Sequence, residues 1–225
     1  MVLLSFPFSR ESQDIDVKAS DSDYRHIEQA YDEGSDDYGS YHREPHAYIE
    51  QERQQFISRL SAGSKILDCG CGPGFDSERF SQLGYKVTAI DLSDRFVELT
   101  RKRAPKANVQ RMDMRHLQFS EAGFDGLWSS FSLLHVRACD IGNTLSGFKS
   151  VLRPGGLLFA ALHRGPKTEW VKVAITAMER ITFVQEWTQT DIEAELRASG
   201  FEIIVSRPFE RKGGRYPLLS ILAHT

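Results

Sequence analysis

Residues 66–75, with the sequence ILDCGCGPGF, carry the strongest chemical signal in the chain. An apolar run ends in Asp68, passes through Gly70, Gly72 and Gly74, and continues into helix-like sequence. Glycines in such a turn let the backbone come very close to a nucleotide-like ligand. A dinucleotide-binding fingerprint, G-x-G-x-x-G counted from Gly70, would place its third glycine at position 75. The bulky Phe75 stands there, so the spacing argues against NAD(P).

Strand-like and helix-like runs alternate on both sides of this loop. The alternation predicts an α/β fold, in which a parallel sheet carries helices on both faces. Two last strands joined by a glycine-containing turn must be antiparallel neighbours. We therefore expect a doubly wound, mostly parallel, seven-stranded sheet with one antiparallel strand. The expected strands are 65–69, 86–90, 108–112, 126–131, 156–162, 201–206 and 217–223, and the expected helices are 75–83, 93–103, 137–152 and 191–199.

The segments before and within this pattern are less regular. Residues 1–60 are expected to form an N-terminal helical extension or lid, with a short helix at 22–31 and a second helix that Pro45 opens. Residues 61–225 form the main domain, with an insertion at about 164–188 over the substrate site. Thr190 is the candidate N-cap of the helix over 191–199, with Glu193 at the capping-box position.

Acids follow three successive predicted strands. Asp68 comes after the first strand, Asp91 after the second and Asp113 after the third, and Ser130 lies at the end of the fourth. Ligands of open parallel sheets bind at the carboxyl ends of the strands. One such acid alone is more often a loop or cap residue. Three of them, following a glycine loop, predict a single ligand site.

The D-x-G-x-G-x-G pattern from Asp68 to Gly74 resembles the first motif of the class I S-adenosylmethionine-dependent methyltransferases. The segments around Asp91 and Asp113 resemble the second and third motifs, and the resemblance covers about residues 31–225. It implies that S-adenosylmethionine is the cofactor and S-adenosylhomocysteine the product. By position, Gly70 and Gly72 would line the methionine part.

The same resemblance assigns roles to the remaining strand-end residues. Asp91 would accept hydrogen bonds from the ribose hydroxyls, Leu92 would contact adenine, and Asp113 with Met114 would fix the adenine edge. Tyr31 and Tyr38 are similar to a Y-D-x-x-x-x-x-Y lid whose tyrosines close over the carboxylate of the cofactor. Packing is an equally good interpretation of both tyrosines.

The chemistry of methyl transfer needs mostly alignment and a dry site, with a base only when the acceptor must lose a proton. His135, after the fourth strand, is the candidate base, although a lone histidine is more often structural. Arg164 could bind a substrate carboxylate, and Trp170, Glu186 and Trp187 could wall the substrate pocket.

Subclasses with recognisable motifs do not fit the chain. Residues 129–132 are SSFS where metal-dependent catechol-type enzymes carry an acid. The Asn/Asp-Pro-Pro-Tyr loop and the Pro-Cys pair of base-modifying and amide-modifying enzymes are absent. The predicted function is methyl transfer to N, O, S or C of a small molecule. A protein of this fold that binds the cofactor for a non-methylating reaction or a regulatory role is the alternative.

The composition sets the expected partners. A net charge of −3 gives no reason to expect a nucleic-acid partner. Three cysteines, an odd and small number, suit a reduced cytoplasmic protein. The pair Cys69 and Cys71 has no second pair or histidine cluster, so no metal site is expected. No apolar run is long enough for a membrane span. The chain is expected to be a monomer or homodimer.

Overall fold

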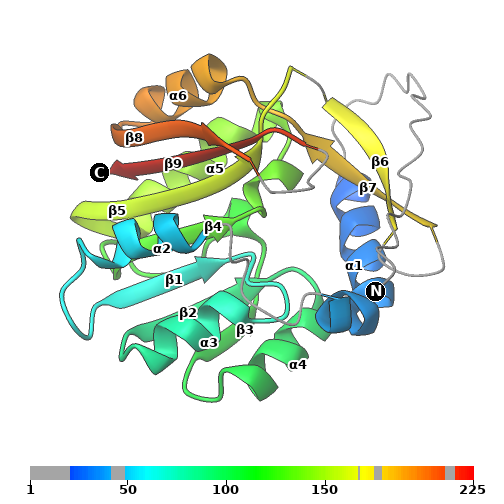
Figure 1. The fold of residues 1–225 in the computed structure, drawn as a ribbon, viewed down its shortest axis with the longest axis horizontal. Helices are drawn as coiled ribbons and strands as arrows, with labels where there is room; N and C mark the ends of the chain where they lie inside the picture. Colours follow the sequence, from blue (N-terminus) through cyan, green and yellow to red (C-terminus); the bar gives the residue numbers. More distant parts are fainter. Residues whose placement is uncertain (1–20, 42–48, 167, 175–178, 211–215) are drawn as a thin grey trace.

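The computed structural model describes residues 21–41, 49–166, 168–174, 179–210 and 216–225. Its main element is a seven-stranded sheet in the order β3-β2-β1-β4-β5-β9-β8 (Figure 1). Strand β9 is antiparallel to both of its neighbours, and the other pairings are parallel. The predicted sheet, with its single antiparallel strand, is therefore confirmed. The strands are β1 (Lys65–Cys69), β2 (Lys86–Asp91), β3 (Asn108–Arg111), β4 (Phe124–Ser130), β5 (Leu152–His163), β8 (Glu202–Phe209) and β9 (Leu218–His224).

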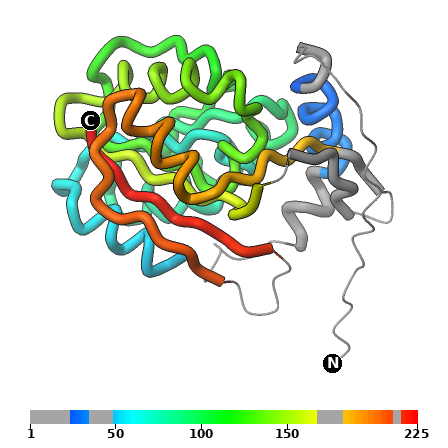
Figure 2. The backbone as a smooth tube through the Cα atoms, turned by 90° about the horizontal axis from the view of Figure 1, so that it is seen from above, coloured from blue at the N-terminus to red at the C-terminus, as the bar shows by residue number. Residues whose placement is uncertain are grey.

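Helices cover both faces of the sheet, as the alternation of elements predicted. Figure 1 and Figure 2 show α2, α3 and α4 on one side and α5 and α6 on the other. The longest described helix, α1, lies beside the sheet. The helices are α1 (Asp21–Tyr41), α2 (Glu50–Ile57), α3 (Phe75–Gln82), α4 (Asp94–Arg103), α5 (Ala138–Val151) and α6 (Gln189–Ala198), with 3₁₀ turns η2 (Met114–His116) and η3 (Leu133–His135).

The two faces of the sheet are built from alternate strand residues. Ile66 packs into a cluster with Phe56 of α2 and Phe80 of α3. The next residue, Leu67, packs with Leu145 of α5 and others on the opposite face. Successive side chains of a strand point to opposite faces, so a strand buried on both sides reads as a continuous apolar run. This double burial holds the carboxyl ends of the strands rigidly in place.

Two elements stand together beside the carboxyl ends of the strands. They are α1 and a two-stranded antiparallel sheet of β6 (Thr168–Ala174) and β7 (Glu179–Gln185), which contacts α1 (Figure 1). The short helix predicted over 22–31 was wrong in length, because α1 continues through Gly34 and Ser35. Packing of its buried face compensates for the low helix propensity of these residues. Gly34 itself is buried.

Other boundaries also differ from the sequence predictions. The N-cap of α6 is Thr188, whose side chain accepts a hydrogen bond from the Asp191 amide at 3.1 Å, so the prediction of Thr190 was wrong. The fifth strand, expected from residue 156, begins at Leu152 in β5 and contains a bulge, where Gly155 has a φ of +70°. Pro45 lies outside the described residues. No helix in the described ranges is long and apolar enough to span a membrane.

Candidate functional site

A cavity opens at the carboxyl ends of β1, β2, β3 and β4, and α1 forms its opposite wall. It collects residues that are far apart in the sequence, from Tyr24 to Val136. The cofactor-binding residues and the candidate base expected from the sequence lie around it, except for Tyr38, whose side chain is outside the described part. Those that line the cavity are Tyr31, Asp68, Gly70, Gly72, Asp91, Leu92, Asp113, Met114, Ser130 and His135.

The glycine loop crosses the floor of the cavity in a conformation that favours glycine. Gly70, Gly72 and Gly74 have φ values of +75°, +52° and +86°. A Cβ atom on Gly70 would lie 2.3 Å from the Cβ of Ser132. The amides of Gly70 and Cys71 both donate to the carbonyl of Ile90, at 2.9 Å each. The backbone of the loop thus lies so close to Ser132 that no side chain fits at position 70.

Asp91 connects the glycine loop to the start of α4. One carboxylate oxygen accepts from the Gly72 amide at 2.8 Å, and the other accepts from the Ser93 amide at 3.0 Å. Burial raises the pKa of Asp91 to about 6, although these backbone donors oppose the shift. Since Asp91 also lines the cavity, its remaining lone pairs can accept hydrogen bonds from a ligand there.

Asp68 lies beneath the loop and is almost fully buried. The Ser77 hydroxyl of α3 donates to its Oδ2 at 2.5 Å. Burial and the nearby carboxylate of Asp76 raise the pKa of Asp68. Asp76, also on the cavity wall, accepts from the Arg53 guanidinium and from Trp128 Nε1 at 2.9 Å. Two carboxyl groups therefore line the cavity together: Asp76 is paired with Arg53, and Asp68 accepts from a serine hydroxyl.

Asp113 is held by a neighbour that the sequence interpretation overlooked. Arg115 Nη2 donates to its Oδ2 at 2.6 Å, and the Arg115 amide donates to its Oδ1 at 2.9 Å. The Arg115 guanidinium also lies 3.3 Å from the ring centroid of Tyr24 on α1. The hydroxyl of Tyr24 in turn donates to Asp140 of α5 at 2.5 Å. The wall after β3 and the helix α1 are thus joined through one arginine.

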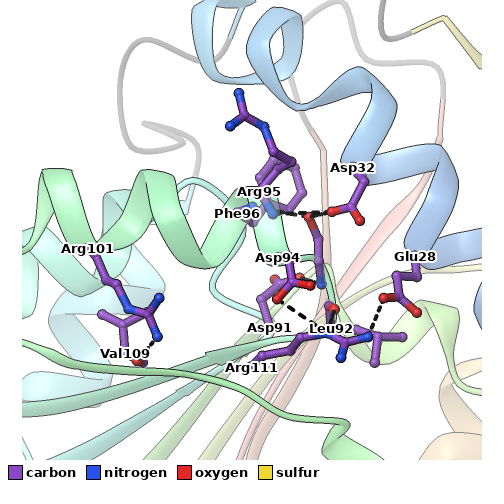
Figure 3. Close-up of polar contacts among 11 residues, drawn as sticks. Glu28, Asp32, Asp91, Leu92, Asp94, Arg95, Phe96, Arg101, Val109 and Arg111 are labelled. Carbon is purple, nitrogen blue, oxygen red and sulfur yellow. Dashed lines mark hydrogen bonds and ion pairs between the residues drawn. The ribbon is translucent and has the colours of Figure 1, made fainter.

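Two acids of α1 bind the edge of the cavity near Asp91 (Figure 3). Asp32 accepts from the Ser93 hydroxyl at 2.5 Å and from the Arg95 amide at 3.2 Å, at the N-terminus of α4. Glu28 forms an ion pair with Arg111, which also donates to the Leu92 carbonyl at 3.1 Å. An acid beside a helix N-terminus is stabilised by the helix dipole. These contacts hold α1 across the cavity.

His135 and Tyr31 of α1 are in contact at the wall of the cavity. His135 Nδ1 lies 2.7 Å from the carbonyl oxygen of Phe183 in β7, and Nε2 lies 2.8 Å from the Tyr31 hydroxyl. Burial lowers the pKa of His135 to about 4, so the ring is neutral at physiological pH. A carbonyl can only accept, so Nδ1 carries the proton and Nε2 accepts from Tyr31.

Backbone strain marks the end of β4, between His135 and the sheet. Phe131 lines the cavity and has a φ of +56°, which bulky residues seldom adopt. Strained residues of this kind cluster at ligand sites. The adjacent Ser130 hydroxyl is buried and has no hydrogen-bond partner among the described residues. Such an unsatisfied group beside a cavity is suited to bind a polar atom of a ligand.

The residues expected to contact substrate from β5 onward lie elsewhere. Arg164 is exposed, and its backbone bridges to Trp187. Glu186 and Trp187 are buried but do not line this cavity. The side chain of Trp170 is outside the described part of the chain. Among the described residues no histidine, cysteine, aspartate and glutamate side chains gather in a group that could hold a metal ion.

Comparison with known proteins gives a family for the segment around the cavity. A family model described as "Methyltransferase domain" matches residues 66–156. A relative from Talaromyces variabilis, named an S-adenosyl-L-methionine-dependent Diels-Alderase, is 33% identical over 138 residues, which are 57% of this chain and 47% of the relative. A ubiquinone biosynthesis O-methyltransferase from Methylocella silvestris is 36% identical over 113 residues, which are 48% of this chain and 43% of the relative. The chain thus matches less than half of the length of either relative.

The structural similarity to solved proteins extends beyond residues 66–156. The 1,6-didemethyltoxoflavin-N1-methyltransferase of Burkholderia thailandensis, solved with its substrate and S-adenosylhomocysteine, has a TM-score of 0.77. It is 20% identical in sequence, and the match covers 95% of this chain and 93% of that chain. Residues 66–156 therefore resemble a methyltransferase domain in sequence, and nearly the whole chain shares the fold of this solved methyltransferase.

Proposed function

We propose that the protein is an S-adenosylmethionine-dependent methyltransferase that acts on a small molecule. The observation that carries the proposal is the cavity itself, which brings the glycine loop and the strand-end acids Asp68, Asp91 and Asp113 to one place. The relative named an O-methyltransferase and the matched methyltransferase model support the same reaction class. The bound cofactor would supply an electrophilic methyl group on a sulfonium centre.

The residues around the cavity fit this cofactor. The loop at Gly70 leaves no room for a Cβ atom, as expected where the backbone must approach a ligand closely. Asp91 would bind the ribose hydroxyls, and Leu92 would contact the adenine. Asp113 and Met114 would lie at the adenine edge, with Arg115 fixing the Asp113 carboxylate. The unsatisfied Ser130 hydroxyl and the Asp68 carboxyl lie at the end where the methionine part would bind.

Lid contacts would exclude water from the reacting atoms. Asp32 and Glu28 hold α1 over the cavity, and a closed site strengthens every electrostatic interaction within it. A cofactor enters only when these contacts open. We therefore assign residues 1–60 to the lid region and residues 61–225 to the cofactor-binding domain, with the segment at 164–188 beside the substrate site. A cytoplasmic location suits the cysteines, none of which is in a disulfide.

The pKa of Asp91 predicts a pH dependence of cofactor binding. Ribose hydroxyls donate to an ionised carboxylate, whereas the raised pKa of about 6 leaves Asp91 largely protonated in more acidic solution. S-adenosylhomocysteine should therefore bind more tightly as the pH rises from about 5 to about 7, and its affinity should then level off. Calorimetric titrations at several pH values measure this change.

The Asp91→Asn variant is the control for this pH dependence, because Asn cannot ionise. It should bind more weakly at neutral pH and should lose most of the change between pH 5 and 7. Burial raises the pKa of Asp68 to about 8, so a change in affinity that remains in Asp91→Asn above pH 7 is assigned to Asp68. An unaltered pH profile in Asp91→Asn would remove Asp91 from the binding site.

The reaction itself is tested by following both the cofactor and the acceptor. The purified protein is incubated with S-adenosylmethionine and pools of small phenols, heteroaromatic N–H compounds, carboxylic acids and thiols. Methyl transfer produces S-adenosylhomocysteine and an acceptor heavier by one methyl group, as mass spectrometry measures. The Talaromyces relative is named for a Diels–Alder reaction, which transfers no methyl group. Cofactor binding without any methylated product would therefore favour the non-methylating alternative.

A further inference from the structure

The contact between Tyr31 and His135 joins a residue of the lid to a residue of the sheet edge. The two rings meet edge to face, with centroids 5.3 Å apart, and both line the cavity. Tyr31 is half-buried, and its hydroxyl lies 2.8 Å from His135 Nε2. The sequence assigned them separate tasks, one to the cofactor carboxylate and one to the acceptor. In the structure the two residues are hydrogen-bonded to each other, through the Tyr31 hydroxyl and His135 Nε2.

The β6–β7 sheet fixes the direction in which a proton can move through this pair. The Phe183 carbonyl accepts from Nδ1 of His135, and this contact leaves the Nε2 lone pair directed at Tyr31. His163, the other titratable group whose charge acts on His135, also has a pKa lowered by burial, to about 4. The pair is therefore a neutral imidazole that accepts from a neutral phenol. With Nδ1 bonded to a carbonyl, Nε2 is the atom of this imidazole that can take up a proton.

We propose that Tyr31 is a catalytic residue that takes the proton of the methyl acceptor and passes its own proton to His135 Nε2. This inference rests on the proposed methyltransferase function and names the substrate class that fits it. The acceptor is a hydroxyl or a ring N–H, which must lose a proton when it is methylated. An acceptor that is already ionised, such as a carboxylate, gains nothing from the pair.

The proton and electron balance of this step is complete. The lone pair of the acceptor atom forms a bond to the methyl carbon, and the carbon–sulfur bond breaks with its electron pair left on the sulfur. The acceptor proton moves to the Tyr31 oxygen while the Tyr31 proton moves to Nε2. One imidazolium forms per turnover, and it returns its proton to solvent after the lid opens. General acid–base catalysis of this kind accelerates reactions by about 10²- to 10⁴-fold.

The variant Tyr31→Phe separates this role from cofactor binding. It keeps the ring that packs against Phe96 and His135 but removes the hydroxyl. S-adenosylhomocysteine affinity should stay within about twofold, while kcat with the acceptor found in the mass-shift screen should fall by about 10²-fold or more. His135→Gln should give a similar loss of kcat. The matched control Tyr85→Phe, whose hydroxyl donates to the Ile57 carbonyl outside the cavity, should change neither quantity.

Nitrogen NMR of histidine-labelled protein tests the pair without any acceptor. The His135 signals, assigned from His135→Gln, should show a proton on Nδ1 and a hydrogen-bonded lone pair on Nε2 at neutral pH. Tyr31→Phe should shift the Nε2 signal and leave Nδ1 bonded. A proton on Nε2 in the wild-type protein would overturn the proposal.

The kinetic and binding results distinguish the remaining possibilities. A Tyr31→Phe protein that loses S-adenosylhomocysteine affinity by tenfold but keeps kcat would place the Tyr31 hydroxyl on the cofactor and overturn the proton relay. Full kcat in His135→Gln would overturn it as well. Absence of cofactor binding and of any methylated product in the wild-type protein would refute the proposed function instead, whatever the NMR signals of the pair.

Discussion

Replacing Asp91 with alanine should weaken the binding of S-adenosylhomocysteine by more than tenfold. The carboxylate would accept from both ribose hydroxyls, and hydrogen bonds to a charged group contribute about 1.5–3 kcal/mol each. A loss of about 1.4 kcal/mol already corresponds to a tenfold change in affinity. The substitution also removes the acceptors for the Gly72 and Ser93 amides, so the glycine loop loses its support. Isothermal titration calorimetry measures the change directly.

A matched control is available three residues further along the chain. Asp94 is exposed and lies outside the cavity, so Asp94→Ala should leave S-adenosylhomocysteine affinity within about twofold. The melting temperature of each variant shows whether a loss of affinity comes with a loss of fold. Equal affinities of wild-type protein and Asp91→Ala would contradict the assignment of Asp91 to the ribose.

Replacing Gly70 with alanine should destabilise the protein far more than the same change at Gly72. Both glycines have positive φ, which costs an L-residue about 1–2 kcal/mol. At position 70 the new Cβ would also lie 2.3 Å from Ser132 Cβ, while at position 72 it meets nothing within 4 Å. Ser132 has little freedom to move away, because its hydroxyl contacts the Cys69 carbonyl at 2.6 Å and Ser129 Oγ at 2.8 Å.

The difference between the two variants isolates the close approach at Gly70. Overpacking costs typically about 1–3 kcal/mol in addition to the backbone strain. For a protein of this size each kcal/mol lowers the melting temperature by about 2–4 °C. Differential scanning calorimetry should therefore give a drop for Gly70→Ala that clearly exceeds the drop for Gly72→Ala. Equal drops in melting temperature would mean that Ser132 moves away from the new Cβ atom at little cost in stability.

The sequence predicted the strands and the acids at their ends because both depend on local patterns. Buried parallel strands are short apolar runs, and an acid or a glycine that ends such a run is visible without any tertiary information. Asp91 illustrates this, since it ends the run before a helix and lines the cavity as expected. The same reasoning predicted that β9 is antiparallel, from the short turn before it.

The length of α1 and the second sheet could not be predicted in the same way. Gly34 and Ser35 are poor helix formers, and only packing against β7 and α4 keeps α1 helical through them. Residues 168–173, with the sequence TEWVKV, are rich in β-branched and aromatic residues, and this was the available signal for β6. The contact between His135 and the Phe183 carbonyl joins residues that are far apart in the sequence. Because its acceptor is a backbone atom, the residue type at position 183 could not predict it.

The contacts that charged side chains make also could not be predicted from the sequence. Arg115 stands two residues after Asp113, but its bidentate contact with that carboxylate and its stacking on Tyr24 depend on the place of α1. The sequence analysis named only Thr190 as the cap of the last helix, whereas the structure has Thr188 there. In both cases the residue types alone did not determine the contact, which depends on the folded backbone.

The measurement that tests the central claim most directly is a pair of thermal melts, one with S-adenosylhomocysteine and one with NADH at the same concentration. A ligand at about 100 times its dissociation constant adds about 2.7 kcal/mol to the stability of the folded state. The melting temperature should therefore rise by several degrees with S-adenosylhomocysteine and stay unchanged with NADH. No rise with S-adenosylhomocysteine, or a rise with NADH alone, would contradict the cofactor assigned to the glycine loop.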